Sequence, residues 1–482
     1  MMKKFLYCAA VQGIQQFIFK TNELKHIVGA SELVEQICTS AFDEYAKNGE
    51  SVVRAAGNIK FIFDNESDCR KAVREFPKRV MTMAPGITVS QTVVPMDDAF
   101  GKSIDDAEAL LKEQRNKPSR SVTSGLIGIK RANNTGLPVV QIRKSDYLDE
   151  STIQKECFQD TKGLSKKSFG ESALDAKSVA YNISDITGKN DWIAIIHADG
   201  NGLGKVVQIV GKKKDVFKDF SQKLDIATKE AANLAFKFVA GSFDDKKVIP
   251  IRPVVLSGDD MTVIIRGDLA IDYANAFITA FEEKTKEHLG DILRDQHVFA
   301  DDKDYLTACA GIAFIKSSYP FYYGYQLAEE LCSQSKKDTK AIHGAETNYL
   351  PPSCLMFHKV QDSFIFNYQD IEKRELTAKD GNLSFKAGPY YIHAQNSKNT
   401  VEDLIKASQM LNSENGDGIK SGIRQWISLR IENKSEADQR KNRMIQIFAD
   451  DTAIKRLTSE ENNRCIAYDV LAYNTIMNQQ TK

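Results

Sequence analysis

The sequence predicts an α+β protein with two ferredoxin-like βαββαβ modules and a C-terminal helical domain. Three observations carry this prediction. Strand, helix and hairpin patterns follow one another in the order βαββαβ across residues 191–340. The N-terminal residues repeat that order, and helical periodicity alone recurs near the end of the chain. We therefore expect a first module (1–100), a polar and helical connection (101–190), a second module (191–345), and an irregular segment with the helical domain (346–482).

The second module begins with a near-continuous apolar run, Trp192–Ala198, which is typical of a buried strand. A helix should follow, because apolar residues recur there at steps of three and four. Its apolar face is expected to hold Phe217, Phe220, Leu224, Ala227, Ala231, Leu234 and Phe238. Two β-branched runs then flank the turn Ser257–Asp260, which indicates a β-hairpin.

The rest of this module is a helix, a strand and a further helix. Asp268 has the chemistry of an N-cap for the first of these elements. The apolar face of that helix is expected to hold Tyr273, Ala274, Phe277, Ile278 and Phe281. The apolar run Leu306–Ile315 predicts the fourth strand, and the last helix should end near Lys336–Lys337.

The first module shows the same plan with a different hairpin tip. The tip is Ala55-Ala56-Gly57-Asn58, which contains no acidic residue, so this module is expected to be a structural copy that lines the substrate cleft. We predict its elements at Phe5–Val11 (strand), Ala30 to about Tyr45 (helix), Val52–Phe63 (hairpin), Ser67–Met83 (helix) and Ile87–Val94 (strand).

Outside the two modules the patterns are weaker. Asp105–Glu113 predicts a helix, whereas Leu164–Glu171 has the composition of a mobile loop. In the C-terminal domain we expect helices at Val401–Leu411, Ile419–Ile431 and Ala437–Ala449.

The composition is that of a folded, soluble protein, with 42% hydrophobic and 27% charged residues. Lys plus Arg and Asp plus Glu both total 65, which argues against a protein that coats nucleic acid nonspecifically but leaves local RNA contacts open. No apolar run approaches the ~18 residues of a membrane span, so we expect a cytoplasmic protein without a membrane partner. The eight cysteines form no CxxC pair, which argues against a zinc site or a disulfide framework.

Three acidic residues are the candidate catalytic and metal-binding groups. Asp259 and Asp260 stand side by side at the tip of the predicted hairpin, and Asp199 follows the Trp192–Ala198 strand. If the strands are neighbours in one sheet, the three carboxylates converge, and hard oxygen ligands suit Mg²⁺ or Mn²⁺. The alternative is a pair of acidic surface turns, since Asp and Gly are ordinary turn residues. Because both motifs occur together, we favour a metal–nucleotide site.

The turns around these acids are candidate nucleotide-binding segments. Backbone amides from Gly200 to Gly204 should lie at the start of a helix, where they can cradle phosphate oxygens. Lys336 is the candidate for the triphosphate tail; alternatively it is a solvent lysine that favours the helix dipole. His197 lies inside an apolar strand and is expected to be a buried, hydrogen-bonded residue. The expected nucleotide-binding residues are Gly200, Asn201, Gly202, Gly204, Ser257, Gly258 and Lys336.

These motifs resemble those of the large palm-polymerase subunit of type III CRISPR effector complexes, a family that makes cyclic oligoadenylates from ATP. Ser257-Gly258-Asp259-Asp260 stands where that family has Gly-Gly-Asp-Asp, and Asp199–Gly204 resembles its strand-one metal motif, usually Asp-Gly-Asp. Further similar segments are Gly13–Phe19, Gly29–Leu33, Ala310–Ala313, Leu327–Leu331 and Ser335–Lys336.

The resemblance implies a metal-dependent nucleotidyltransferase that makes cyclic (oligo)nucleotide second messengers from ATP in a CRISPR-type or related antiviral defence system. It implies two Mg²⁺ or Mn²⁺ ions ~3.5–4 Å apart, held by Asp199, Asp259 and Asp260. The implied partners are the nucleoside triphosphate, guide and target RNA, and other effector subunits. Whether the protein also forms a homo-oligomer is left open.

The chain departs from the family pattern in three ways. It starts at the first palm without the His-Asp dipeptide of the family's HD nuclease domain, so we expect a reduced relative that does not cleave DNA. Cys157 is the only cysteine between the palms, which argues against the family's zinc segment. Asn201 replaces an acidic residue and Ser257 a glycine, which leaves product and base specificity open.

Two other interpretations stay open. A nucleotidyl cyclase or a cyclic-dinucleotide synthase with the same palm would keep all three carboxylates and differ only in its product. A non-catalytic scaffold subunit of an RNA-guided effector would be expected to have lost at least one of them.

Overall fold

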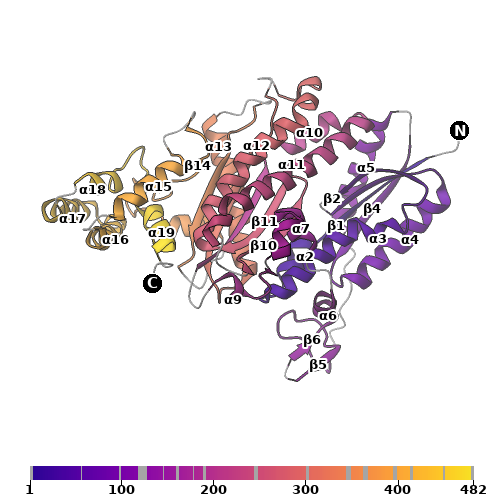
Figure 1. Cartoon of the computed structure of the whole chain (residues 1–482), viewed down its shortest axis with the longest axis horizontal. Coiled ribbons are helices and arrows are strands. Elements are labelled where there is room, and N and C mark those ends of the chain that lie inside the picture. Colours follow the sequence, from indigo (N-terminus) through magenta and orange to yellow (C-terminus); the bar gives the residue numbers. More distant parts are fainter. Residues whose placement is uncertain are drawn as a thin grey trace.

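The computed structural model describes residues 4–55, 57–96, 99–117, 127–144, 146–158, 162–176, 178–187, 192–243, 248–299, 303–343, 349–361, 367–394, 399–412, 416–448 and 451–478. Ala56 of the first hairpin tip and Ala449, the expected end of a C-terminal helix, lie outside these ranges. Two sheets with packed helices form the body of the molecule, and further helices extend from one end (Figure 1).

The first sheet has four antiparallel strands in the order β2-β3-β1-β4, as a ferredoxin-like module requires. The predicted plan is therefore confirmed. Its elements are β1 (Phe5–Gln12), α1 (Ile14–Phe19), α2 (Leu24–Cys38), α3 (Ser40–Asp43), β2 (Gly49–Ala55), β3 (Asn58–Phe63), α4 (Glu66–Met83) and β4 (Thr88–Pro95).

The first long helix of this module differs from the prediction at both ends. It begins at Leu24, because Leu24, Ile27 and Val28 already face the core in its first turns. It ends at Cys38, since Thr39 leaves the helical conformation with φ −101° and ψ −102°. The expected continuation to Tyr45 is therefore wrong: the short helix α3 takes its place.

The second sheet has six strands in the order β10-β11-β8-β12-β13-β14. Its first four strands repeat the ferredoxin-like arrangement, which confirms the predicted second module. The elements of this sheet and its helices are β8 (Trp192–Gly200), α10 (Leu203–Val210), α11 (Lys214–Ala240), β10 (Ile251–Ser257), β11 (Asp260–Arg266), α12 (Ala270–Asp295), β12 (Ala308–Lys316), α13 (Phe321–His343), β13 (Cys354–Lys359) and β14 (Tyr390–Tyr391).

Two strands extend this sheet beyond the predicted four. Strand β13 pairs in parallel with β12, and Cys309 lies opposite Cys354. The sequence placed Cys354–Lys359 in an irregular segment, but Cys354, Leu355 and Met356 are buried in the sheet. A short apolar run carries no periodicity that distinguishes a strand from other buried structure.

Two predictions about helices of the second module are wrong. Asp268 does not cap α12, because a 3₁₀ turn (Gly267–Leu269) precedes that helix and the Asp268 carboxylate accepts two hydrogen bonds from Arg266. On α11, Leu234 and Phe238 are 37% and 68% exposed, although their spacing suggested the core face. The other five expected core residues of α11 are buried.

The connection between the modules is more ordered than its composition suggested. The helix predicted at Asp105–Glu113 is confirmed within α5 (Phe100–Arg115). The expected mobile loop at Leu164–Glu171 is wrong, because residues Gly163–Phe169 form α7, whose Phe169 stacks on Phe236 of α11 with ring centroids 4.4 Å apart. The remaining elements are β5 (Gln141–Arg143), β6 (Asp146–Leu148), α6 (Glu150–Cys157), α8 (Glu171–Ala176), β7 (Ser178–Val179), α9 (Ile183–Ile186) and β9 (Val248–Ile249).

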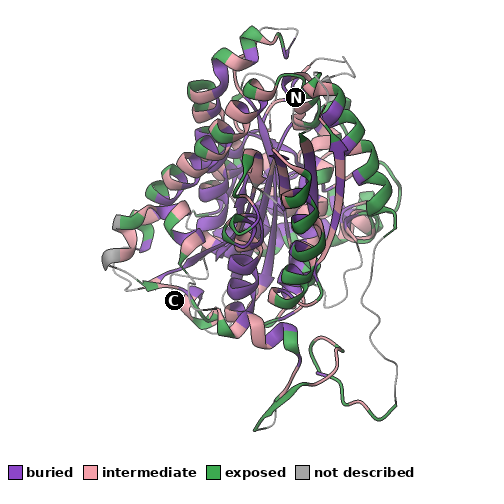
Figure 2. Ribbon diagram, turned by 90° about the vertical axis from the view of Figure 1, so that its right-hand side faces the viewer, coloured by how far each residue is buried: buried purple, intermediate pink, exposed green. Residues whose placement is uncertain are grey.

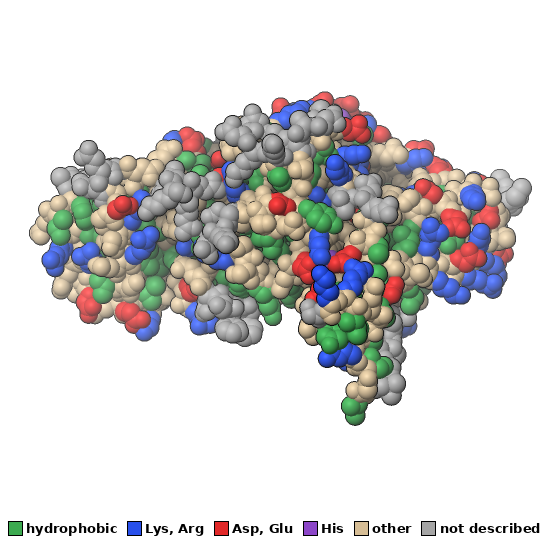
Figure 3. Space-filling model, turned by 60° about the horizontal axis from the view of Figure 1, so that its bottom comes forward, with side chains coloured by type: hydrophobic (Ala, Val, Ile, Leu, Met, Phe, Trp, Pro, Cys, Tyr) green, Lys and Arg blue, Asp and Glu red, His purple; other side chains and the backbone are tan. Residues whose placement is uncertain are grey.

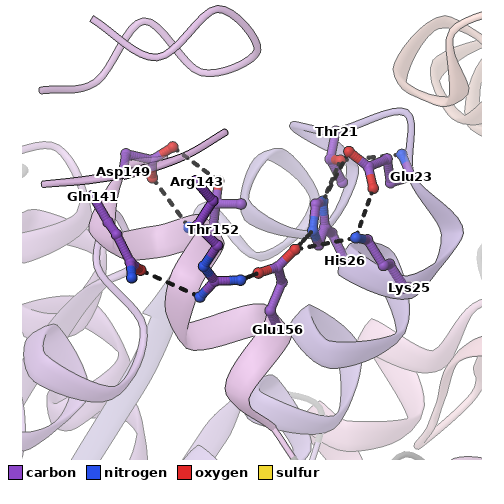
Figure 4. A network of polar contacts seen from close by, with 9 residues as sticks. All are labelled: Thr21, Glu23, Lys25, His26, Gln141, Arg143, Asp149, Thr152 and Glu156. Atoms are coloured by element: carbon purple, nitrogen blue, oxygen red, sulfur yellow. Dashed lines mark hydrogen bonds and ion pairs between the residues drawn. The ribbon is translucent and has the colours of Figure 1, made fainter. Parts of the chain in front are cut away.

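A polar network attaches the β5–β6 hairpin and α6 to the first module (Figure 4). Glu156 of α6 lies at its centre. Its carboxylate accepts hydrogen bonds from Lys25 of α2 (3.1 Å) and Arg143 of β5 (2.6 Å), and lies 2.9 Å from Nε2 of His26. The hairpin projects from the body with basic and hydrophobic side chains on its surface (Figures 1 and 3).

The C-terminal part is helical, as predicted. Its helices are α14 (Tyr368–Glu375), α15 (Val401–Gln409), α16 (Gly416–Glu432), α17 (Lys434–Ile447), α18 (Asp451–Leu457) and α19 (Ala467–Asn478). The strands of both sheets are mostly buried, while the outer faces of the helices are exposed (Figure 2). Within the described ranges, no helix combines the length and apolarity that a bilayer crossing requires.

Candidate functional site

The sheet brings the three predicted carboxylates together. Strand β8 pairs with β11 so that Ala198 lies opposite Met261, which sets Asp199 beside Asp260 at the start of β11. Asp259 occupies the tip of the β10–β11 hairpin between the two strands. Carboxylate oxygens of Asp199, Asp259 and Asp260 all lie within 4.8 Å of one another.

Two glycines make this approach possible. Gly258 adopts φ +64°, a conformation that the tight hairpin requires and that favours glycine. The hydroxyl of Thr228 on α11 donates a 2.6 Å hydrogen bond to the Gly258 carbonyl and holds the tip in place. At Gly200, an added Cβ would lie 2.8 Å from Oδ2 of Asp259, so only glycine lets the hairpin carboxylate come this close to β8.

Burial and mutual repulsion make the acid cluster electrostatically costly. Burial, with Asp199 nearby, raises the pKa of Asp259 to about 7. Burial, with Asp259 and Asp199 nearby, raises the pKa of Asp260 to about 8. Burial alone would raise the pKa of Asp199 too, but Lys336 and hydrogen bonds from the other two acids hold it below its usual value. The cluster therefore favours one ionised carboxylate unless a cation offsets the others.

Lys336 supplies the positive charge that the structure shows at this cluster. Its ammonium group reaches from α13 to the Asp199 carboxylate and donates a 2.8 Å hydrogen bond to the Gly200 carbonyl. Lys336 is therefore not a solvent lysine at a helix end, because α13 continues to His343. Its predicted contact with a triphosphate stays a prediction.

The donor set fits a hard divalent cation. Three carboxylates with no nitrogen or sulfur ligand are the chemistry that Mg²⁺ and Mn²⁺ prefer. A bound cation would offset the burial and the neighbouring acids that raise the pKa of Asp259 and Asp260. Among the described residues a second group of potential ligands, Glu230, Glu287 and His288, lies on α11 and α12. Lys284 already pairs with its two carboxylates.

The acid cluster lies at the wall of a cavity of about 490 Å³ between the two modules. Asp260, Ser257 and Thr262 line it from the second module. From the first module, the turn after β1 and the hairpin tip contribute Gly13, Ile14, Gln15, Gln16 and Gly57. A volume of this size is typical of small-molecule sites of about 300–1,000 Å³. Tyr325 of α13 stacks on Phe19 of α1 with centroids 4.3 Å apart and joins the two modules beside the cavity.

The other predicted site residues lie close to the acids, but not all of them face the cavity. Gly202 is the N-cap position of α10 with φ +71°, and nothing lies within 4 Å of a Cβ at Gly204, so both backbones are accessible. Asn201 is 1% exposed, and its amide donates a 3.0 Å hydrogen bond to Thr307. Nucleotide contacts of these residues stay predictions.

His197 is buried as expected. Its Nδ1 lies 3.1 Å from the Thr262 hydroxyl. Burial, partly offset by Asp199, lowers the pKa of His197 to about 4, so its ring is neutral near pH 7.

The internal repeat shows that only the second module carries carboxylates at the corresponding positions. Ala55 pairs with Asn58 in the first hairpin as Ser257 pairs with Asp260 in the second. Asn58 lies opposite Ala10 of β1, the position that corresponds to Asp199. Gly13 caps α1 with φ +74°, much as Gly202 caps α10. The first module thus keeps the backbone turn but has no carboxylate at these positions.

Sequence reasoning missed several residues that line the cavity, and it missed Thr228, which holds the hairpin tip. Gln15 and Gln16 follow Gly13 at the turn that repeats the acidic motif, so the internal repeat was a usable signal for them. Thr228 and Tyr325 carried only a helical pattern, which places residues on a face but does not identify what that face contacts.

Comparisons with known proteins agree with this fold. Residues 192–342 match the family model described as Cas10/Cmr2, second palm domain. No curated protein matches the chain in sequence. The fold is similar to that of Csm1 in a Csm1–Csm4 cassette in complex with cA4, with a TM-score of 0.60 at 12% identity over 99% of this chain and 69% of that chain.

Two other solved structures give similar values. The Csm1–Csm4 cassette in complex with AMPPNP matches with a TM-score of 0.60 at 12% identity, over 99% of this chain and 70% of that chain. The Csm1–Csm4 subcomplex of the type III-A CRISPR-Csm interference complex matches with a TM-score of 0.60 at 13% identity, over 98% and 70%. At such identities the likeness is one of fold.

Proposed function

Starting from a Cas10/Cmr2-type second palm within a Csm1-like fold, we propose that this protein is a nucleotidyltransferase that joins ATP molecules into cyclic oligoadenylate. One observation carries the proposal: three carboxylates lie within 4.8 Å of one another, and one of them, Asp260, lines a cavity shared by the two modules. The wider setting we propose is a type III CRISPR complex, in which other subunits and guide and target RNA are the partners.

Asp199, Asp259 and Asp260 are the groups that would hold two Mg²⁺ or Mn²⁺ ions. Bound there, these ions would lower the pKa of the attacking ribose hydroxyl and offset charge on the α-phosphate. The amides of Gly202 and Gly204, at the start of α10, would donate hydrogen bonds to phosphate oxygens, which the N-terminal position on a helix supports. We propose that Lys336 exchanges Asp199 for the triphosphate when ATP binds, because both offer it an oxyanion.

The first module would hold the acceptor nucleotide. Its turn at Gly13–Gln16 lines the same cavity as Asp260 of the acid cluster. With both nucleotides in place, the acceptor ribose oxygen forms a bond to the donor α-phosphorus. The bond between that phosphorus and the bridging oxygen breaks, pyrophosphate leaves, and the hydroxyl proton passes to solvent. Holding both reactants in line makes this step effectively unimolecular.

The experiment is incubation of the purified protein with ATP and Mg²⁺ or Mn²⁺, alone and assembled with partner subunits on guide and target RNA. We expect oligoadenylate and pyrophosphate, with a rate that rises more steeply than the first power of ATP at low concentration. Asp259→Asn with Asp260→Asn is the matched inactive control. A 3′,5′-cyclic mononucleotide as the only product, with first-order dependence on ATP, would contradict the proposal. Parallel reactions with GTP, CTP and UTP test the base.

A further inference from the structure

A group of cations gathers at the end of the second sheet that is opposite the acid cluster. Trp192 starts β8 and pairs with Lys316 at the end of β12, while Asp199 lies seven residues further along β8. At ~3.3 Å per residue, the two ends of this strand are ~23 Å apart. The ammonium groups of Lys316 and Lys359 lie 4.2 Å and 5.1 Å from the centre of the same Trp192 ring.

Arg424 of α16 adds a third positive charge to this end of the sheet. Burial, with Arg424 and Lys316 nearby, lowers the pKa of Lys359 to about 8. In the part of the chain that the structure describes, no carboxylate lies within ion-pair distance of Lys359 or Arg424. The carboxylate of Glu375 contacts the neighbouring residues Tyr468 and His358. It accepts a 3.1 Å hydrogen bond from the Tyr468 hydroxyl and lies 3.9 Å from Nε2 of His358.

Like charges that share a partly buried site destabilise the fold unless an anion offsets them. The indole of Trp192 supplies some compensation, because the face of an aromatic ring attracts cations. That attraction does not neutralise Lys359 and Arg424, since the ring has no net charge. The arrangement is therefore that of a site prepared for a negatively charged ligand.

A hollow of about 280 Å³ opens beside Lys359 and Arg424, where β13 meets α16 and α19. Ser428 and Tyr468 line it together with the aliphatic side chains of Ile427 and Leu471. The Ser428 hydroxyl donates to the Arg424 carbonyl and the Tyr468 hydroxyl to Glu375, so the groups that can pair with an oxyanion are Lys359 and Arg424. The apolar side can cover a flat or hydrophobic group. The volume is slightly below the range that is typical of small-molecule sites, about 300–1,000 Å³, so a small ligand fits better than a polymer strand.

We propose that this hollow is a second ligand site, which binds the phosphate group of a molecule no larger than a nucleoside monophosphate between Lys359 and Arg424. Lys316 contributes to the positive field of the site from β12. The proposal does not depend on the proposed function, because the hollow and the acid cluster lie at opposite ends of the sheet. A ligand here contacts β13, α16 and α19 together and so stabilises the junction between the second module and the C-terminal helices.

The test compares thermal midpoints with inorganic phosphate, with AMP and with chloride at equal ionic strength. For the wild-type protein we expect phosphate and AMP, but not chloride, to raise the midpoint, because a ligand that binds only the folded state stabilises it. Equal affinities for phosphate and AMP would show that the site binds inorganic phosphate and does not recognise the nucleoside. At least tenfold tighter binding of AMP would show that the apolar wall holds the nucleoside.

Two substitutions separate this site from the cavity between the modules. In Lys359→Met we expect a higher midpoint without anion, since the crowded ammonium is gone, and at least tenfold weaker binding of phosphate. Arg424→Gln, on an exposed position, should weaken binding equally. Arg443→Gln, an exposed arginine on α17 away from the hollow, is the matched control and should keep the wild-type response. A structural role for Lys359 would instead lower the midpoint of its variant.

The proposal fails if phosphate and AMP leave the wild-type midpoint unchanged. It also fails if Lys359→Met and Arg424→Gln both keep the full response, since the anion then binds elsewhere, for example in the cavity between the modules. If single-stranded RNA binds the wild-type protein and not these variants, while phosphate and AMP do not bind, the cations serve a nucleic acid and the small-ligand site is excluded.

Discussion

At the scale of single residues, the acid cluster carries the proposed chemistry and lowers the free energy of unfolding. Burial, with Asp199 nearby, raises the pKa of Asp259, and burial, with Asp259 and Asp199 nearby, raises the pKa of Asp260. Lys336 offsets only part of this negative charge. Removing one acid should therefore lower activity and raise stability. The repulsion that favours a bound cation opposes folding when no cation is bound.

We predict that Asp260→Asn abolishes triphosphate turnover and raises the thermal midpoint of the metal-free protein. Activity is lost because the variant has two carboxylates for the divalent ions. Stability rises because the amide is neutral and similar in shape. Turnover is followed by pyrophosphate release and stability by calorimetry with a chelator present. Conversion of ATP at the wild-type rate would show that the reaction uses another site.

The same substitution should reveal a pH dependence. The folded-state pKa of Asp260, about 8, is above its unfolded value near 3.8. The folded protein thus binds the proton more tightly, and stability falls as pH rises from about 4 to about 8. The midpoint difference between Asp260→Asn and wild type should accordingly be small at pH 5 and larger by at least about 2 °C at pH 8.5. A constant difference would mean that Asp260 is not protonated near neutral pH.

Lys336→Met tests the lysine that pairs with Asp199. Without metal, we expect a loss of about 1–3 kcal/mol in the free energy of unfolding, because a half-buried carboxylate loses its cation. With ATP and metal, we expect a raised KM, as the triphosphate loses a contact. Lys337→Met is the neighbouring control on the same helix. An unchanged KM would assign Lys336 to folding alone.

At the scale of elements, glycines set how closely helices approach the sheets. Gly311 of β12 packs directly under α13, and an added Cβ would overlap the Ala328 carbonyl oxygen. The same helix carries Lys336 to Asp199 and Tyr325 to the cavity wall. A displacement of α13 would therefore alter the site from a distance.

We predict that Gly311→Ala lowers the free energy of unfolding by about 1–3 kcal/mol through overpacking. It should also reduce turnover although it changes no residue of the cavity. Urea unfolding and ATP turnover measure the two effects. Gly241→Ala, with no atom within 4 Å of the new Cβ and no positive φ, is the matched control at a distant glycine. Full activity with full stability in Gly311→Ala would contradict the close packing of α13.

At the scale of the whole molecule, the cavity exists only because the two modules face each other. Phe19 of α1 stacks on Tyr325 of α13, and Gln15 donates a 3.4 Å hydrogen bond to Glu329.

We predict that Gln16→Trp, which narrows the first-module side of the cavity, strongly reduces formation of internucleotide bonds while metal binding at the acids is retained. Asn58→Ala, at the acid-free hairpin, should reduce activity only modestly. Equal effects of both substitutions would contradict an acceptor site at the Gly13 turn.

The sequence by itself determined the two ferredoxin-like modules and the acid-bearing hairpin, whereas the meeting of Asp199 with Asp259 and Asp260 was expected only on the condition that β8 and β11 are neighbours, which the sheet pairing then showed. The modules and the hairpin follow from local patterns: alternating or continuous apolar runs, helical spacing and turn residues at fixed positions. Tertiary structure alone decided that Leu164–Phe169 is a helix, that Cys354–Lys359 joins the sheet, and that Lys336 reaches Asp199. These depend on partners far along the chain, and a contact between distant segments leaves no periodic trace in either one.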